Sequence, residues 1–316
     1  MKLIRGLNSS QLNGNACVAT IGNFDGLHLG HQKIISKLKD KARELSLPLT
    51  VISFEPLPAE FFLPQAPARI YPMRDKVRLL KMLGVDHYLC LNFDDEFAQQ
   101  APEDFAQSVL FDALNTKYLA VGDDFRFGNQ RKGDFKLLQT LGEKHAMQVV
   151  DTPTCTFNNE RVSSTRIRKH LEAGELAQAN QLLGYPYQLS GRIRHGDKRG
   201  RTIGFPTLNL KVAENIAPQR GVYAVKVYGL KDDDVLNRDY LTGVANLGNR
   251  PTVNGLENRL ETHLFDFDSD VYGKYICVEL VKFIRPEQRF EDFNALKAQI
   301  LNDAEQAKAV FMNGYE

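Results

Sequence analysis

The sequence has few cysteines, almost no net charge and no long apolar run. Its cysteines lie far apart and form no C-x-x-C pair; they are Cys17, Cys90, Cys155 and Cys277. This spacing argues against a zinc ribbon and a disulfide framework. A formal net charge of +1 gives no reason to expect a nucleic-acid or membrane surface. No run approaches the ~18 apolar residues of a transmembrane helix, and residues 1–10 lack the apolar core of a secretory signal, so we expect a cytoplasmic protein.

The composition is that of a globular protein with two parts. With 316 residues, 43% hydrophobic and 25% charged, the chain is long enough for two domains with their own cores. In the first part predicted strands and helices alternate, one helix covering 102–114, which indicates a parallel sheet. The second part suits a small antiparallel barrel. Its predicted strands are 187–193, 221–228, 240–246, 259–267 and 275–284. We therefore predict an α/β domain at 1–184 and, at 185–316, a β-barrel domain with a closing helix at 290–311.

The stretch from Ile21 to His31 joins a buried strand to a helix through a glycine-rich turn. The apolar run 16–21 precedes the turn, and a helical pattern follows at once. Such a turn leaves backbone N–H groups at the positive end of a helix, where phosphate binds. His28 and His31 face the same way in the first helical turn and can donate to a nucleotide's phosphates. Surface histidines or half of a metal site are the alternatives, but the sequence places no further ligands nearby.

A loop after the predicted strand at 117–121 carries an acid and two aromatic residues. Asp124, Phe125 and Phe127 lie where ligands of parallel sheets bind, beyond the carboxyl end of a strand. This position favours a substrate loop. A surface turn with both rings folded back into the core is the alternative.

The segment from Ser163 to Arg168 predicts a helix start that binds an anion. Ser163, Ser164 and Thr165 are good N-cap residues, yet Arg166 and Arg168 place cations where the helix dipole disfavours them. An anion held there resolves this conflict. Hydroxyls, backbone N–H groups and an arginine together can bind the β- and γ-phosphates of ATP.

The barrel part begins with a basic, glycine-rich segment at 191–201. It lacks the Gly-Lys-Ser/Thr of a Walker A loop, so it is either a basic hairpin or a phosphate-binding flap. Thr207 and Asn209 follow in an extended segment and share a face, which offers two oxygen ligands to Mg²⁺. Glu261 and His263 share a face of a later strand, where a solvent-facing glutamate is the ordinary outcome.

Several of these segments resemble known motifs. Residues 22–31 read G-N-F-D-G-x-H-x-G-H, and residues 163–168 read S-S-T-x-I-R. Both resemble bacterial FAD synthetases of the nucleotidyltransferase superfamily, as does G-x-D-F-x-F-G at 122–128. The P-T-x-N run at 206–209 resembles riboflavin kinases. From residue 22 to about 290, the chain resembles the bacterial bifunctional riboflavin kinases and FMN adenylyltransferases.

For the first part, the resemblance implies a Rossmann-like nucleotidyltransferase domain that joins ATP and FMN to give FAD and pyrophosphate. His28 and His31 would stabilise charge on the α-phosphate, and Ser164 with Arg168 would carry the triphosphate. The other residues implied in ATP binding are Gly22, Asn23, Phe24, Asp25, Gly26, Ser163 and Thr165. The residues implied in a flavin loop are Asp124, Phe125 and Phe127.

For the second part, the resemblance implies a riboflavin kinase in which Glu261 takes the proton of the attacking ribityl hydroxyl. Thr207 and Asn209 would bind Mg²⁺. The residues implied in binding the ATP of the kinase are Gly191, His195, Gly196, Arg201, Gly204, Phe205, Pro206 and Asn246. The expected partners are ATP, riboflavin and FMN, with no nucleic acid or membrane and a monomer as the default. A single-activity nucleotidyltransferase on another substrate and a non-enzymatic flavin-binding regulator are the alternatives.

Overall fold

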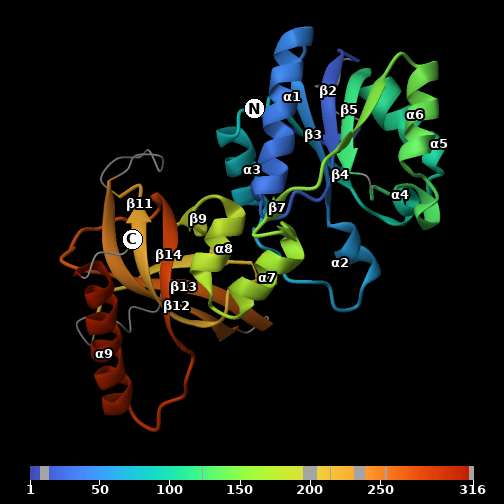
Figure 1. The fold of residues 1–316 in the computed structure, drawn as a ribbon. Helices are drawn as coiled ribbons and strands as arrows, with labels where there is room; N and C mark the ends of the chain where they lie inside the picture. The colour runs from blue at the N-terminus through green and yellow to red at the C-terminus, as the bar shows by residue number, and fades with distance from the viewer. Residues whose placement is uncertain are drawn as a thin grey trace. The chain divides into compact units, whose positions relative to one another are not determined.

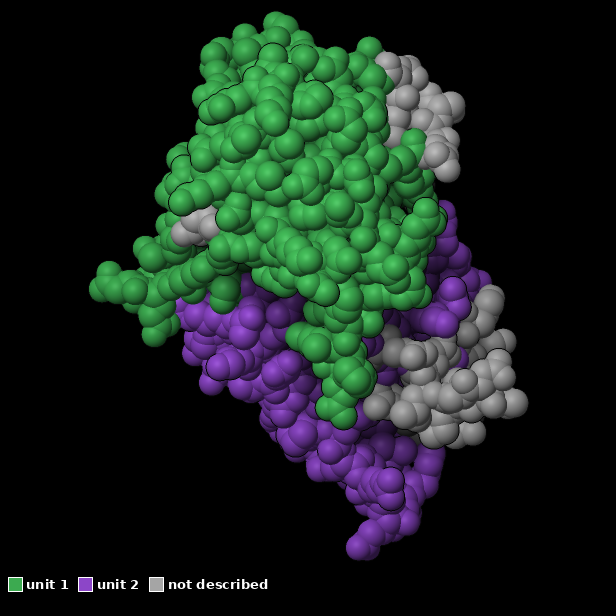
Figure 2. Space-filling model, turned by 90° about the vertical axis from the view of Figure 1, so that its right-hand side faces the viewer, with its two compact units in different colours: residues 1–67, 76–163 green, residues 68–75, 164–316 purple. Residues whose placement is uncertain are grey.

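The computed structural model describes the chain except residues 8–13, 123, 195–204, 214, 231–238, 253–254 and 313–316, and it describes no side chains at 249–257. The chain forms two compact units, coloured separately in Figure 2: residues 1–67 with 76–163, and residues 68–75 with 164–316. The division of function at residue 184 stays a prediction. Within the described ranges, no helix combines the length and apolar character needed to span a bilayer.

The first unit is built on a six-stranded sheet in which all neighbouring strands are parallel (Figure 1). The strands are β1 (Lys2–Arg5), β2 (Cys17–Ile21), β3 (Leu49–Glu55), β4 (His87–Asn92), β5 (Thr116–Gly122) and β6 (Gln148–Thr152). All five residues of β2 are buried, as expected of a parallel strand covered on both faces. The order β1-β4-β3-β2-β5-β6 places the switch point of the topology between β2 and β5. The predicted parallel α/β domain is confirmed.

Helices cover both faces of this sheet, with α1 on one face and α5 and α6 on the other (Figure 1). The helical segments are α1 (Leu29–Leu45), α2 (Pro58–Phe62), α3 (Met73–Met82), α4 (Asp95–Gln99), α5 (Pro102–Phe105), the π-helical η1 (Ala106–Ala113), the 3-10 turn η2 (Asn129–Arg131) and α6 (Phe135–Lys144). α1 buries Ile35, Leu38 and Ala42, the apolar stripe that its helical spacing predicts. A short hairpin, β7 (Thr156–Phe157) with β8 (Glu160–Arg161), follows β6.

The helix predicted at 102–114 is confirmed as an uninterrupted helical stretch, α5 followed by η1, but the π-helical form of η1 was not predicted. Ala106, Val109 and Leu110 of η1 are buried in the core of the first unit. The π-helical segment changes the hydrogen-bond period and therefore the spacing of the buried side chains. Apolar periodicity in the sequence does not distinguish this arrangement from an ordinary helix.

The second unit contains a nearly closed antiparallel barrel of six strands, as predicted. The strands are β9 (Gln188–Arg192), β10 (Leu208–Val212), β11 (Gly221–Tyr228), β12 (Tyr240–Thr252), β13 (Gly255–Leu264) and β14 (Tyr275–Pro286). Their order is β10-β13-β12-β11-β14-β9. Between the two end strands, the backbone N–H of Arg194 donates to the carbonyl of Asn209 over 2.9 Å.

The predicted strands omit β10, stop before the end of β12, and replace the start of β13 with residues beyond its end. The backbone pairs these two strands from Gly243 opposite Leu264 to Thr252 opposite Gly255. Residues 247–258 contain many polar residues and a proline, which indicate a loop when read locally. The ladder forms because each arm supplies the other's hydrogen-bond partners, which local reading does not detect.

Helices and one distant segment complete the second unit. α7 (Ser164–Glu172) and α8 (Leu176–Leu183) are separated at Gly174, which has a positive φ of +74°. From segment 68–75, Tyr71 stacks on Tyr187 at 4.9 Å. α9 (Phe293–Met312), the predicted closing helix, buries Ala304 and Ala307 with residues of β11 and β12.

Candidate active sites

The turn between β2 and α1 is held in a fixed conformation by buried contacts. Phe24 and Leu27 have positive φ angles of 46° and 40°, and both side chains are buried. The carbonyl of Asn23 accepts hydrogen bonds from the ammonium of Lys76 at 2.8 Å and from the hydroxyl of Ser53 at 3.3 Å. These contacts place the residues that follow at the switch point of the sheet, the usual ligand site of this architecture.

His28 and His31 form a stacked pair at the start of α1. Their ring centroids are 3.7 Å apart, and the ring planes differ by 17°. His28 is the N-cap residue, with 7% of its surface exposed. Nδ1 of each ring is buried and has no hydrogen-bond partner among the described residues. Two aligned rings with unsatisfied ring nitrogens are suited to contact a ligand that supplies the missing partners.

Burial also sets the charge of this pair. It lowers the pKa of His28 to about 4; a backbone hydrogen bond opposes the shift, and the charge of Arg161 adds to it. Burial, with the charges of His28 and Lys76, holds the pKa of His31 well below its usual value. Both imidazoles are therefore neutral near pH 7. Where the chain is described, no cluster of three His, Cys, Asp or Glu side chains suited to a metal ion is found, so the pair is not part of such a cluster there.

The loop after β5 contributes one exposed acid and two stacked rings. Asp124 is exposed and pairs with Arg161 of β8 at 3.0 Å. Phe125 stacks on Phe127 at 5.6 Å, but Phe127 itself is buried in the core of the unit. The alternative of a ring folded back into the core is therefore correct for Phe127. Phe125 is only partly buried and Asp124 remains at the surface, so these two residues are the accessible part of the predicted flavin loop.

Aromatic side chains gather where β3 and β4 end, at the same carboxyl edge of the sheet. Phe93, which follows β4, lies 5.6 Å from Phe54 at the end of β3 and 5.4 Å from Phe61 of α2. Phe62 lies 5.6 Å from Phe93 and is 60% exposed. An exposed ring supported by an edge-on cluster is an apolar platform for a planar ligand.

In the second unit, the predicted anion-binding segment starts α7. Ile167 and Leu171 of this helix are buried. Arg168 is positioned by a hydrogen bond from its Nε to the carbonyl of Ala68 at 2.6 Å. Ser164 is the first helical residue, whereas Thr165 is exposed. Ser163, the residue before the helix, is the last residue of the first unit.

The barrel aligns three predicted residues across neighbouring strands. In the ladders, Glu261 of β13 lies opposite Asn209 of β10 on one side and Asn246 of β12 on the other. Paired residues of a sheet project from the same face. Oδ1 of Asn209 is buried and has no hydrogen-bond partner in the described parts of the chain, while its Nδ2 donates to the carbonyl of Thr207 at 3.3 Å. A hard, unsatisfied oxygen beside a carboxylate fits a Mg²⁺ ion.

His263 ties this strand to the segment that precedes β10. Its Nδ1 lies 3.0 Å from the carbonyl of Pro206, and its ring lies 4.8 Å from that of Phe205. Because a carbonyl only accepts, Nδ1 carries the proton. His263 thus fixes the residues that lead into Thr207 and Asn209.

The remaining predicted kinase residues are placed only in part. Gly191 is a buried residue of β9, paired with Ile276 of β14, so it belongs to the barrel wall. The predicted residues that lie outside the described ones are His195, Gly196, Arg201 and Gly204.

Comparison with known proteins covers both parts of the chain. The FAD synthetase family matches residues 10–166, and the riboflavin kinase family matches residues 183–311. The chain is 47% identical to the bifunctional riboflavin kinase/FMN adenylyltransferase of Escherichia coli (strain K12), over 98% of both chains. It is 45% identical to that of Haemophilus influenzae, over 98% of this chain and 99% of the other. The chain belongs to the bifunctional riboflavin kinase/FMN adenylyltransferase family.

The fold of this chain also resembles that of a solved structure. It is titled a macrolide-efflux protein from Streptococcus pneumoniae, and it matches 100% of both chains with a TM-score of 0.79 and 30% identity. The motifs did not point to Arg161 or to Phe62. Arg161 becomes visible only through its ion pair with Asp124, whereas the Phe61-Phe62 pair inside a proline-rich stretch was a signal in the sequence.

Proposed function

We propose that the chain makes FAD in two steps. In the barrel, riboflavin is phosphorylated by ATP to give FMN and ADP. In the first unit, FMN reacts with a second ATP to give FAD and pyrophosphate. The observation that carries the proposal is the stacked, buried pair of His28 and His31 with unsatisfied Nδ1 atoms, in a chain of this family.

The adenylyl transfer needs no nucleophile from the protein, because the FMN phosphate is already an anion and attacks the α-phosphate directly. The protein must instead stabilise the charge that develops there. His28 and His31 are neutral donors near pH 7, and a polyphosphate beside them would raise both pKa values. We assign Ser164 and Arg168, supported by Ser163 and Thr165, to the β- and γ-phosphates. The backbone of residues 22–26 would bind the same nucleotide.

FMN carries a planar, largely apolar ring system that needs a stacking surface. We assign this role to Phe62 on its cluster with Phe61 and Phe93, and to Phe125. Asp124 is the accessible polar group of the same edge. It forms an ion pair with Arg161, whose charge also lowers the pKa of His28.

In the kinase step, Glu261 would take the proton of the ribityl hydroxyl as that oxygen attacks the γ-phosphate of ATP. Thr207 and Asn209 would hold Mg²⁺, which when bound neutralises charge on the nucleotide phosphates. His263 positions the Pro206 segment that carries these two ligands. We place Asn246, Phe205 and Pro206 at the nucleotide, with the flap residues His195, Gly196, Arg201 and Gly204.

Chromatography of riboflavin incubated with the pure protein, ATP and Mg²⁺ tests the proposal. FMN should appear first and FAD after it. Conversion of added FMN but not of riboflavin would remove the kinase assignment and leave a single-activity nucleotidyltransferase. Tight flavin binding without consumption of ATP would instead support a flavin-binding regulator.

A further inference from the structure

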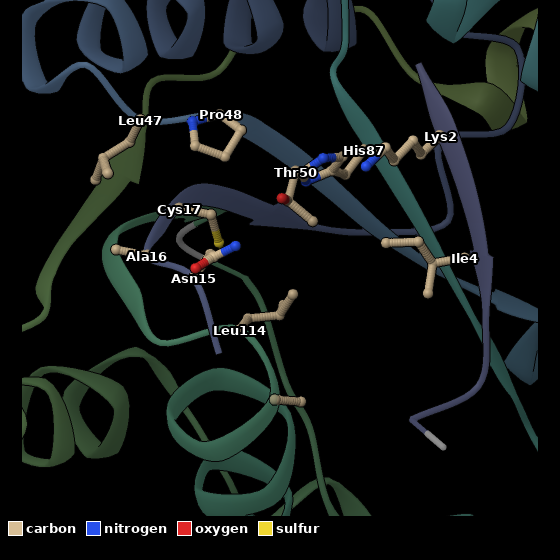
Figure 3. Close-up of a pocket in the computed structure, with 11 residues that line it drawn as sticks. Lys2, Ile4, Asn15, Ala16, Cys17, Leu47, Pro48, Thr50, His87 and Leu114 are labelled. Carbon is tan, nitrogen blue, oxygen red and sulfur yellow. The ribbon is translucent and has the colours of Figure 1, made fainter. Parts of the chain in front are cut away.

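A cavity of about 550 Å³ lies at the amino edge of the parallel sheet, within the first unit (Figure 3). The His28 turn follows the opposite, carboxyl end of β2. The cavity is therefore separate from the nucleotide site that we propose, and no step of either reaction uses the residues that line it.

Three polar residues form a row across the floor of this cavity. Lys2 of β1 pairs in register with His87 of β4, which pairs with Thr50 of β3. Adjacent strands lie ~4.8 Å apart, and paired residues project from one face. The next row on that face is Ile4, Leu89 and Ile52, all buried in the apolar core. On this face of β1, β3 and β4, the polar residues are thus confined to the first row.

Thr50 is the unusual member of the row. None of its surface is exposed, and its Oγ1 has no hydrogen-bond partner among the residues described. The thiol of Cys17 is a polar neighbour of Thr50. Burial raises the pKa of this thiol, and the hydroxyls of Thr50 and Thr116 oppose that shift. A buried hydroxyl without a firm partner is costly, and Thr50 is one of the residues that line the cavity (Figure 3).

The charges around the cavity limit its ligand to a single negative charge. Among the lining residues that the structure describes there is no aspartate or glutamate, and Lys2 is the one lysine or arginine. The carboxylate of Asp86 and the N-terminal ammonium also act on His87, but they shift its pKa in opposite directions. Burial lowers the pKa of His87, so this imidazole is neutral at pH 7 and serves as a hydrogen-bonding group. A phosphate dianion would need more positive charge. Besides Asn15 and Cys17, the rest of the wall is apolar and consists of Ile4, Ala16, Leu47, Pro48, Ala113 and Leu114.

We propose that this cavity binds a small monocarboxylic acid with an apolar body. The carboxylate would lie over His87, between the ammonium of Lys2 and the hydroxyl of Thr50, and the apolar body would contact the wall at Ile4 and Leu114. Binding here is independent of the proposed reactions.

Octanoate serves as the probe, and octylamine, with a similar chain and the opposite charge, serves as the control. We would titrate each into the full-length protein without ATP or flavin and follow the imidazole signals by NMR. The His87→Gln variant identifies the signal of His87. Octanoate should shift this signal saturably, and octylamine should bind at least tenfold more weakly.

Variants locate the site. Thr50→Val, which removes the hydroxyl at nearly constant volume, should weaken octanoate binding about fivefold, whereas Thr50→Ser should bind like the wild type. Lys2→Gln should weaken binding about as much as Thr50→Val. Lys37→Gln, an exposed lysine of α1, should change nothing.

Three results would overturn the proposal: no saturable shift of His87 up to ~10 mM octanoate, equal binding of octylamine, or unchanged affinity in both Thr50→Val and Lys2→Gln. Thermal unfolding of each variant shows whether it is folded. A folded Thr50→Ser that binds normally keeps the test valid even where Thr50→Val is unstable.

Discussion

The two candidate sites place their polar groups in opposite environments. His28 and His31 are buried, stacked and neutral in the absence of a ligand. Glu261 is only half-buried and lies between two asparagines of the neighbouring strands. The difference matches the two reactions. An attacking phosphate needs fixed donors at the developing charge, whereas an attacking hydroxyl needs a carboxylate that can take a proton.

The largest effect should come from removing the proposed base, Glu261. Glu261→Gln keeps the size of the side chain but not its proton affinity, so phosphorylation of riboflavin should fall by about 10²–10⁴. Adenylyl transfer to added FMN should be unchanged. Asp268→Asn, an exposed acid beyond β13, is the matched control and should retain both activities. A Glu261→Gln enzyme with normal kinase activity would show that this carboxylate is not the base.

A smaller effect should come from crowding the histidine pair. A Cβ atom at Gly30 would lie 3.1 Å from Cε1 and 3.2 Å from Nδ1 of His28. Gly30→Ala should therefore displace the ring by a few tenths of an ångström and slow adenylyl transfer about tenfold or less. Alanine is also the better helix former, by ~1 kcal/mol. We expect the Gly30→Ala variant to have lower adenylyl transfer activity without lower thermal stability. Unchanged adenylyl transfer would argue against a tightly fixed His28 ring.

Phe62 tests the aromatic surface of the first unit. Phe62→Ala should raise the KM for FMN about fivefold through the lost ring contact, with little change in kcat. Phe293→Ala, a similarly exposed ring at the start of α9, should leave adenylyl transfer unaltered. Equal KM values in the two variants would place the flavin ring elsewhere.

The smallest effect concerns stability. His28 has a pKa of about 4 in the folded protein and an ordinary value of 6.5. Between these values the unfolded chain binds more protons, so the free energy of unfolding rises with pH, by at most ~1.4 kcal/mol per pH unit for this group. Urea unfolding of His28→Asn between pH 4.5 and 7 should therefore depend less on pH than that of the wild type. Identical slopes would contradict the buried, neutral state of His28.

Local sequence signals predicted the elements that depend on neighbouring residues. The alternating strands and helices, the glycine turn before His28 and the helical pattern of α1 all follow from short-range patterns. The missed features depend on distant partners or altered geometry. β10 is a strand because β13 pairs with it, and the π-helical form of η1 has no apolar period of its own.

The candidate sites divide in the same way. His28, Asn209 and Glu261 stand in motifs that can be recognised along the chain, but the alignment of Asn209 with Glu261 comes from the strand register. The burial of Phe127 and the ion pair between Asp124 and Arg161 are likewise properties of the folded unit. Sequence supplied the types of residue, and packing determined which of them are accessible.

The central claim is that the two reactions use separate sets of residues. The most direct test is to assay both activities in the His28→Ala variant. His145→Ala, an exposed histidine in the same unit, is the control. FAD formation from added FMN should fall about a hundredfold or more, while FMN formation from riboflavin should be unchanged. Equal loss of both activities in a folded His28→Ala protein would contradict the account.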